Sequence, residues 1–316
     1  MRIWFFWKWG AWKSTFAAAM TRFIQQKFPD KTIIAMDGDI NMHLGMYLGI
    51  WPVKMLHPLM KEISDYVFWQ RDDILCDHFI ASTPPHRLSN FIHCTSDDTF
   101  LQKFADFKKN IALLSVGTFR EEEVWKACFH GKLNAFDYIY NHLLDTNDDI
   151  VISDCMAWID NLWTANYFVH DISIYVIEPT IQSIQVYKDY QAATRNTWLH
   201  HKVIINKVTD IQDKAFVLQH IDETTILWWI KHSESLRRFN QWSFEALDDF
   251  VTENTALFTN IHNQAVSLWK NRDVYLDRLQ QTYISKCDIR YNDYHNSTLY
   301  NHTDKTFTYT DVIPWI

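Results

Sequence analysis

The chain has 316 residues, a formal net charge of −8 and 47% hydrophobic residues. This length suits one large domain with an addition, and the negative charge provides no overall basic field for nucleic acid. Apolar runs stay shorter than the roughly 18 residues that indicate a membrane span, and the first residues lack a signal-peptide pattern. We therefore expect a cytoplasmic protein. The five scattered cysteines form no C-x-x-C pair, which favours reduced thiols.

The first predicted strand, Ile3 to Phe6, leads through a loop into a predicted helix, Phe16 to Phe28. The loop matches the phosphate-binding template G-x-x-x-x-G-K-[ST] at Lys13 and Ser14, but tryptophan stands on both template glycines. The whole segment reads Trp7-Lys8-Trp9-Gly10-Ala11-Trp12-Lys13-Ser14-Thr15. Such a loop turns backbone N–H groups inward around an anion, which requires positive φ at some positions and close backbone approach. Taken literally, the indole at position 12 would fill the phosphate space.

The composition of the chain offers a second explanation for these tryptophans. The chain contains 6 glycines and 15 tryptophans, and together they make up about 7% of the residues, the usual share of glycine alone. The codon UGA is read as tryptophan in some genetic codes and as glycine in certain bacterial lineages. We therefore hypothesise that most of the tryptophans, including Trp7, Trp9 and Trp12, are glycines written through the wrong code. The alternative is a degenerate loop in a pseudo-ATPase.

Further along the chain, apolar runs typical of strands alternate with helical patterns such as Ile181 to Arg195. This alternation predicts a doubly wound, three-layer α/β fold with a mostly parallel sheet covered on both faces. The predicted strands are Thr32 to Met36, Asn110 to Val116, Ile150 to Ser153, Ile172 to Ile177 and Val203 to Asn206. From about Asn271 the composition shifts to tyrosine, asparagine, aspartate, histidine and threonine, which indicates a C-terminal extension of uncertain order.

Acidic residues follow two of the predicted strands. The second strand ends in Met36-Asp37-Gly38-Asp39, and the run Ile150-Val151-Ile152-Ser153-Asp154 is an apolar strand that ends in an acid. A carboxylate at the end of a buried strand is costly unless it has a partner, which favours a functional role for Asp154. Asp37 and Asp39 could instead cap the helix that follows them.

Lys8 supplies an extra lysine inside the loop, which then has the form K-x-G-x-x-K-S-T. This pattern resembles the deviant Walker A motif of the MinD/ParA/nitrogenase-reductase (SIMIBI) class of dimeric P-loop ATPases. Asp37 and Asp39 resemble the D-x-D switch I element of that class, and Asp154 resembles its Walker B acid. The resemblance covers residues 1–260, which we predict to be the ATPase domain, and leaves residues 261–316 as the extension.

Three later motifs extend the resemblance. Ala157-Trp158-Ile159-Asp160 is similar to the switch II A-G-I-[DE] of CooC-like ATPases, again with tryptophan in place of glycine. Glu178-Pro179-Thr180 resembles the turn that follows a strand in that family, and Asn206-Lys207 resembles the strand end that recognises the base.

Phosphoryl transfer requires mainly that charged groups are positioned and neutralised. Lys13 is therefore expected to contact the β- and γ-phosphates of ATP, Ser14 to hold Mg²⁺, and Thr15 to bind near the α-phosphate. Asp39 is expected to orient or deprotonate the attacking water, while Asp37 and Asp154 support Mg²⁺ through water. The residues expected to bind the nucleotide are Trp7, Lys8, Trp9, Gly10, Ala11, Trp12, Lys13, Ser14, Thr15 and Asn206.

The expected roles of Lys8 and Asn206 depend on further assumptions. The resemblance implies that Lys8 is catalytic and reaches the nucleotide of a partner across an ATP-dependent homodimer. Asn206 can present both a donor and an acceptor to adenine, although an asparagine at a strand end can also simply form a turn.

Within the class, the chain most resembles the CooC-like ATPases that serve nickel insertion into carbon monoxide dehydrogenase, which implies a client metalloenzyme as partner. Nickel-binding members are expected to carry a C-x-C pair, whereas this chain has Cys128-Phe129-His130. Cys128 and His130 from two chains could form a four-ligand Ni²⁺ or Zn²⁺ site at the dimer interface. A structural cysteine beside a surface histidine explains the same residues.

Two other functions stay open. A spatial-organising ATPase of the MinD/ParA type would need a basic amphipathic C-terminal helix for membranes or a basic stripe for DNA. Asp311 to Ile316 is not such a helix, and the clearest basic cluster, Arg237-Arg238, is short. If the tryptophans of the loop are genuine, the chain is an interaction module that does not bind nucleotide.

Overall fold

The computed structural model describes residues 1–6, 12–68, 85–118, 121, 133–145, 149–155, 169–195, 200–269, 277, 307–309 and 312. The strands are β1 (Arg2–Phe6), β2 (Ile33–Gly38), β3 (Ile92–His93), β4 (Asp106–Lys108), β5 (Ile111–Ser115), β6 (Leu143–Leu144), β7 (Ile150–Cys155), β8 (Ile172–Ile177), β9 (His201–Val208) and β10 (Ile226–Lys231). The α-helices are α1 (Lys13–Lys27), α2 (His43–Leu48), α3 (Met60–Val67), α4 (Thr99–Phe104), α6 (Asn134–His142), α7 (Ile181–Thr194), α8 (Ile211–Leu218), α9 (Glu234–Phe239), α10 (Ala246–Glu253) and α11 (Thr255–Trp269). Short 3₁₀ helices cover His57–Leu59 and Glu223–Thr225.

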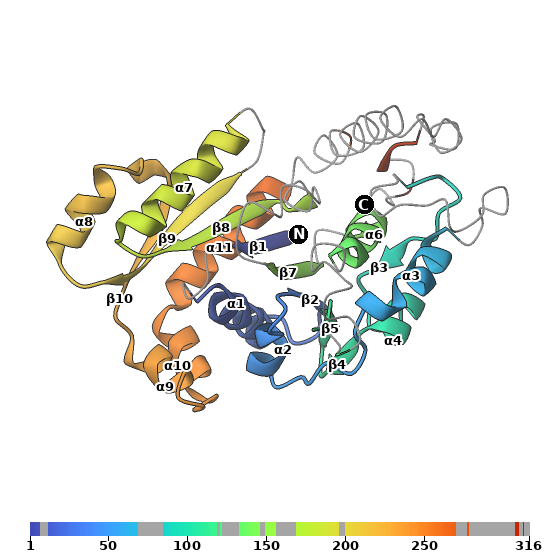
Figure 1. The fold of residues 1–316 in the computed structure, drawn as a ribbon. Coiled ribbons are helices and arrows are strands. Elements are labelled where there is room, and N and C mark those ends of the chain that lie inside the picture. Colours follow the sequence, from blue (N-terminus) through green and yellow to red (C-terminus); the bar gives the residue numbers. More distant parts are fainter. Residues whose placement is uncertain are drawn as a thin grey trace.

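One large sheet runs through the middle of the molecule (Figure 1). Within the described residues it has eight strands in the order β10-β9-β8-β1-β7-β2-β5-β4. Neighbouring strands are parallel except for the edge pair β4 and β5, which is antiparallel. The strand β1 lies inside this sheet, and all five of its residues are buried because helices cover both faces. The predicted α/β fold with a mostly parallel sheet is confirmed.

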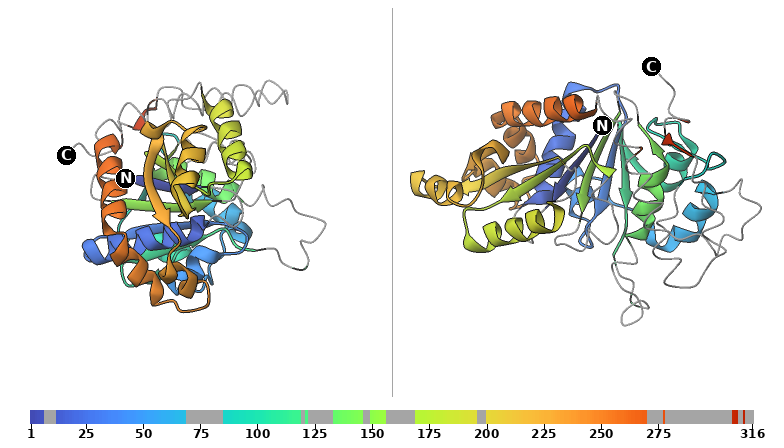
Figure 2. Two further views of the ribbon diagram at one scale, coloured as in Figure 1. Left: turned by 90° about the vertical axis from the view of Figure 1, so that its left-hand side faces the viewer. Right: turned by 90° about the horizontal axis from the view of Figure 1, so that it is seen from above.

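Alternate residues of each strand pack into the layers on opposite faces of the sheet. In β1, Ile3 and Phe5 join the hydrophobic cluster that includes residues of α1, α10 and α11. Trp4 and Phe6 point to the other face, where they pack with residues of α7 and α8. Farther along that face, α3, α4 and α6 pack on β2 and β5. Figure 2 shows the sheet between these two layers of helices.

The predicted strands appear at their expected places, with small shifts at their ends. Ile172–Ile177 agrees with the prediction, whereas β9 extends beyond Val203 to Asn206 at both ends. Sequence patterns missed β10, although Ile226 to Ile230 is a continuous apolar run; β10 is a mostly half-buried edge strand that pairs with β9 through register shifts. The strands β3 and β6 have two residues each, too few to show a periodicity.

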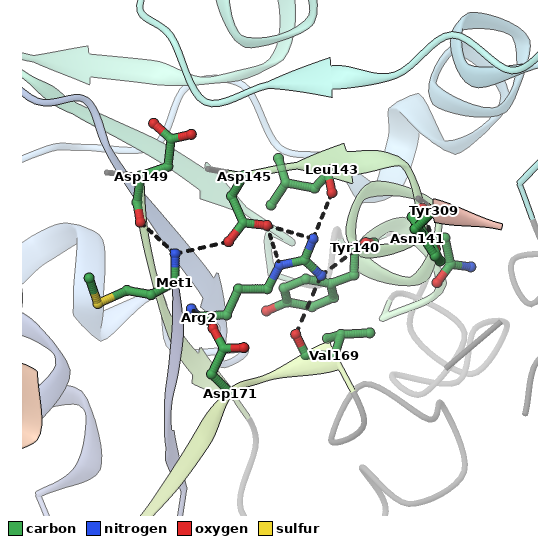
Figure 3. A network of polar contacts seen from close by, with 10 residues as sticks. All are labelled: Met1, Arg2, Tyr140, Asn141, Leu143, Asp145, Asp149, Val169, Asp171 and Tyr309. Carbon is green, nitrogen blue, oxygen red and sulfur yellow. Dashed lines mark hydrogen bonds and ion pairs between the residues drawn. The ribbon is translucent and has the colours of Figure 1, made fainter. Parts of the chain in front are cut away.

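A buried polar network fastens the amino end of β1 to the segment around α6 (Figure 3). The Arg2 guanidinium donates to the Asp145 carboxylate and to the backbone carbonyls of Tyr140, Leu143 and Val169. A second contact with Asp145 comes from Nη2, so each of the five guanidinium N–H groups has an acceptor. Because every N–H group has an acceptor, Arg2, which is only 1% exposed, can remain charged within the core.

Part of the predicted C-terminal extension packs into the core. Phe307 and Tyr309 are buried, and the Tyr309 hydroxyl donates a 2.6 Å hydrogen bond to the carbonyl of Asn141 in α6. The ring of Phe307 stacks on Phe91 with centroids 5.9 Å apart. Helix α11 continues across residue 260, where we place the end of the ATPase domain; that boundary stays a prediction.

Candidate functional site

Three neighbouring strands bring the predicted acidic residues together at the carboxyl ends of the strands. Because β1, β2 and β7 are parallel, their carboxyl ends lie together. Asp37 of β2 is directly opposite Asp154 of β7, and Asp154 is also opposite Phe5 of β1. Helix α1 begins at Lys13, close to these ends, because Lys13 contacts Asp154.

The ammonium group of Lys13 is the centre of this cluster. Its Nζ forms an ion pair with Asp39 and lies 3.2 Å from Asp154 Oδ1. A third contact, at 3.5 Å, is with the hydroxyl of Ser14. The Lys13 side chain is 7% exposed. The structure thus brings the adjacent residues Lys13 and Ser14 together with Asp39 and Asp154, which are far from them in the sequence.

These contacts shift the pKa values of all three charged partners. Burial opposes the charge on Lys13, but Asp154 and Asp39 outweigh it and raise the pKa of the lysine. Burial also opposes ionisation of Asp39, yet the lysine and the hydrogen bonds from Asn41 lower the pKa of this carboxyl. Asp154 is wholly buried, and desolvation outweighs the charge of Lys13 and raises the pKa of this carboxyl.

Asp37 lies beside this cluster without touching the lysine. Its carboxylate accepts hydrogen bonds from the backbone N–H groups of Gly45, at 3.0 Å, and Asp39, at 3.3 Å. Complete burial, and then the charge of Asp154, raise the pKa of Asp37 to about 8. Asp37 therefore connects the start of α2 to the end of β2. Gly45 is the third residue of α2, so the Asp37 carboxylate accepts a hydrogen bond from one of the first-turn N–H groups that have no partner within the helix, which agrees with the capping alternative for Asp37.

The carboxylates at these strand ends suit a hydrated magnesium ion. Asp154 Oδ2 is buried and has no hydrogen-bond partner among the described residues. A buried carboxylate oxygen without a partner is costly, and oxygen ligands are the ones that Mg²⁺ prefers. The hydroxyl of Ser14, which like Asp154 lies beside the Lys13 ammonium, provides a second oxygen. Ser14 and Asp154 thus fit the metal that we expect.

The residue before α1 has the backbone of a glycine. Trp12 has φ 70° and ψ 25°, in the left-handed region, and its side chain makes no capping hydrogen bond. A bulky residue in this region is strained, at a cost on the order of 1–3 kcal/mol, whereas glycine adopts it freely. The ring of Trp12 packs partly against the core cluster under α1. This geometry agrees with the hypothesis of miscoded glycine, which stays a prediction.

The carboxyl end of β9 reaches the same loop. The Nζ of Lys207 lies 5.2 Å from the ring centroid of Trp12 and forms a 2.5 Å ion pair with Glu178. Asn206, next to it, is 1% exposed; its Oδ1 accepts from the Lys207 N–H, and its Nδ2 has no partner among the described residues. A buried amide donor without a partner fits a ligand acceptor such as a ring nitrogen of adenine.

One residue of this site, Tyr47, could not be found from sequence patterns. Burial raises the pKa of the Tyr47 hydroxyl, from α2, and the neighbouring Thr15 side chain on the first turn of α1 opposes this shift. The ring of Tyr47 also stacks on His43 and meets Phe239 of α9 edge-on, with centroids 4.7 Å apart. Only the packing of α2 on α1 brings Tyr47 to Thr15, since no motif links the two positions.

Other predicted residues lie outside the part of the chain that the structure describes. They are Trp7, Lys8, Trp9, Gly10, Ala11, Cys128, His130 and the segment 157–160. Within the described ranges, no group of three or more histidine, cysteine or acidic side chains could hold a metal ion by itself. In those same ranges no helix has the length and apolar character to cross a membrane.

A hollow of about 670 Å³ lies away from this cluster. It is lined by residues such as Arg22, Asp30 and Asp248, and includes none of the predicted nucleotide-binding residues. Its lining carries both charge signs and comes from the second half of α1, the residues before β2 and β5, Ser96, and Asp248 of α10. The carboxyl edge of the sheet, with its lysine and acids, is therefore the better candidate site.

Comparisons with known proteins add the fold class. No family model matches the chain, and no curated protein does. The ParA family ATPase of Chlorobium tepidum TLS is similar over 84% of this chain and 98% of its own, at 15% identity and a TM-score of 0.50. The cell division ATPase MinD of Pyrococcus furiosus gives 14% identity over 84% of this chain and 98% of its own, with a TM-score of 0.48. MinD of Pyrococcus horikoshii OT3, complexed with Mg-ADP, gives 16% identity over 87% and 97%, with a TM-score of 0.48. The chain thus has the α/β fold of the ParA family ATPase.

Proposed function

We propose that this protein binds ATP with Mg²⁺, dimerises on it and hydrolyses it. The observation that supports the proposal most is the position of Lys13, whose ammonium lies at the carboxyl edge of the sheet beside Ser14, Asp39 and Asp154. A lysine at a helix N-terminus next to a hydroxyl and carboxylates is the set of groups that phosphate and Mg²⁺ require.

Each residue has a task in this proposal. Lys13 binds the β- and γ-phosphates, and the N-terminus of α1 with Thr15 binds near the α-phosphate. Ser14 and Asp154 hold Mg²⁺, which when bound neutralises charge on the phosphates. Asp39 orients the attacking water and accepts its proton.

Two further residues complete the proposed site. Asn206 donates its free Nδ2 hydrogen atoms to adenine, which selects for this base. Lys8 reaches the nucleotide of the partner chain, so that hydrolysis depends on the dimer.

The proposal requires glycine at positions 7, 9 and 12 in the protein that the native host makes. Support comes from the left-handed backbone at position 12. Peptide masses of the native protein decide the matter, since glycine is about 129 Da lighter than tryptophan, and a chain with normal glycine usage would show many such differences. Tryptophan at all three positions would leave the interaction module as the better function.

Nucleotide binding can then be tested directly on the full chain with glycine at these three positions. We expect it to bind labelled ATP in the presence of Mg²⁺, and Lys13→Ala to abolish the binding. Lys27→Ala is the matched control, because Lys27 lies on the same helix but is exposed at its far end. Equal binding by the Lys13→Ala and Lys27→Ala proteins would refute the proposal.

For the process that the ATPase serves, we propose maturation of a metal cofactor in a client metalloenzyme. This rests on the resemblance to CooC-like ATPases and on Cys128 and His130 as Ni²⁺ or Zn²⁺ ligands across the dimer. Equilibrium dialysis tests it: the ATP-bound dimer should bind Ni²⁺ or Zn²⁺, and Cys128→Ser should not. Equal metal binding by both proteins would contradict it.

A spatial-organising role is the second candidate. It is supported by the likeness of the fold to a protein described as a ParA family ATPase. Such a protein should associate with DNA or with vesicles only in its ATP-bound form. Sedimentation with either surface, with ATP and with ADP, separates this role from metal-cofactor maturation.

A further inference from the structure

All three N–H donors of the Lys13 ammonium are in use. They are directed at Asp39, at Asp154 and at the Ser14 hydroxyl, and the amine is almost completely buried. An ammonium has three donors and no more. A phosphate oxygen can therefore bind Lys13 only if one of these acceptors gives up its place. Replacement of the Ser14 hydroxyl, at 3.5 Å, would leave both carboxylates on the ammonium and facing the phosphate, so a carboxylate has to move.

The carboxylates of Asp39 and Asp154 differ in how easily they can move away from Lys13. Asp154 belongs to β7, which is paired on both sides with β1 and β2, and its side chain is 0% exposed. Asp39 lies after β2, on a turn that precedes α2, and its side chain is 12% exposed. Asp39 is thus the acceptor that can be displaced.

We infer that Asp39 competes with the nucleotide phosphates for Lys13, so that it holds the site closed until the nucleotide displaces it. This inference rests on the proposed function. The charges explain the competition, because one ammonium faces two carboxylates and an incoming polyphosphate adds further negative charge to the same place.

The competition links binding to the next step of the reaction. While Asp39 is paired with Lys13 it is not free to accept a proton from water. Its displacement by phosphate releases the carboxylate for the attacking water at the moment when the nucleotide is in place. One residue therefore both restrains binding and, after binding, serves hydrolysis.

Asp39→Asn tests the inference, because asparagine keeps an oxygen for Asn41 but loses the charge that holds Lys13. In the full chain with glycine at positions 7, 9 and 12, we expect the variant to bind labelled ATP about tenfold more tightly, and to hydrolyse it more slowly. The gain should be larger in EDTA than with Mg²⁺, which offsets the negative charge. Asp65→Asn, a surface change of equal charge beside Lys61, should leave the affinity unchanged.

The outcomes separate the two proposals. If Lys13→Ala abolishes binding but Asp39→Asn binds no more tightly than the parent chain, the competition is refuted and the proposed function stands. If Lys13→Ala binds as the parent does, the proposed function fails and the competition with it.

Hydrogen exchange on the parent chain gives a second test that needs no variant. The N–H of Asn41 is bonded to Asp39, and that of Gly45 is bonded to Asp37. Addition of Mg-ATP should accelerate exchange at Asn41 as Asp39 moves, while Gly45 keeps its protection. Unchanged exchange at Asn41 at saturating nucleotide would overturn the inference.

Discussion

Arg2 and Asp145 form an ion pair in which Nη2 lies 3.0 Å from Oδ1 and each side chain is 1% exposed. The other carboxylate oxygen of Asp145 lies 3.0 Å from the amino group of Met1 (Figure 3). The pair connects the central strand β1 to the chain after β6, on the edge of the sheet opposite the candidate site. Strand β1 leads directly toward that site, since Phe5 near its carboxyl end is opposite Asp154.

Replacement of Arg2 by methionine should lower the free energy of unfolding by about 3–5 kcal/mol, because Asp145 would lose its main buried partner. Urea denaturation followed by circular dichroism measures the change. Arg237→Met is the matched control, since Arg237 pairs with Glu234 on the exposed surface, and no measurable change is expected there. Equal stability of the two variants would contradict a structural role for the Arg2 network.

His142 should make the protein sensitive to acid. Burial lowers its pKa to about 4, although a 2.8 Å contact with the Tyr138 carbonyl opposes the shift. In the unfolded chain the pKa of histidine is near 6.5. Between about pH 6.5 and 4 the unfolded state therefore binds a proton that the folded state does not bind. Stability should fall by about 3 kcal/mol as the pH drops through this range.

His142→Asn removes the titrating group and keeps an N–H donor for Tyr138. We expect denaturation curves of this variant to lose that part of the acid dependence, whatever its stability at neutral pH. His220→Asn, a change at an exposed histidine, should keep the dependence of the parent chain. A parallel pH profile for His142→Asn and the parent would show that this histidine does not cause the sensitivity.

Removal of the indole ring should affect stability differently at Trp242 and at Trp4. Trp242 has φ 72° and is 68% exposed, so Trp242→Gly should relieve backbone strain and leave the melting temperature unchanged or raised. Trp4 is 0% exposed, and Trp4→Ala should cost about 3–5 kcal/mol. Calorimetry of both variants checks this. A loss of stability in Trp242→Gly as large as that in Trp4→Ala would argue against a glycine-like site at 242.

The hydrogen bond from Tyr309 should hold the end of the described chain on α6. Tyr309→Phe removes only the hydroxyl that binds the Asn141 carbonyl, and should cost about 1 kcal/mol. Tyr66→Phe is the control, because the Tyr66 hydroxyl binds Thr99 at an exposed position. If chemical denaturation gives no larger loss for Tyr309→Phe than for Tyr66→Phe, this contact does not contribute to stability.

The sequence predicted the fold class because strands buried on both faces consist of continuous apolar runs, such as Ile172–Ile177. It also placed Lys13 and Ser14 at the start of a helix and acids at the ends of two strands. These are local properties, set by neighbours along the chain. The two-residue strands β3 and β6 were not predictable, because they are too short to show a periodicity. Edge strand β10 was missed although Ile226 to Ile230 is a continuous apolar run.

Only the tertiary structure decided which of these residues meet. The order of β1, β7 and β2 brings Asp154 and Asp39 to Lys13, and the packing of α2 on α1 brings Tyr47 to Thr15. The contacts in turn set the charge balance, since burial and neighbouring charges, rather than residue type, raise the pKa of Asp37 and lower that of Asp39. The sequence determined which chemical groups the candidate site could contain, and the fold decided that one lysine is shared by two carboxylates, because only folding brings distant groups within a few ångströms of one another.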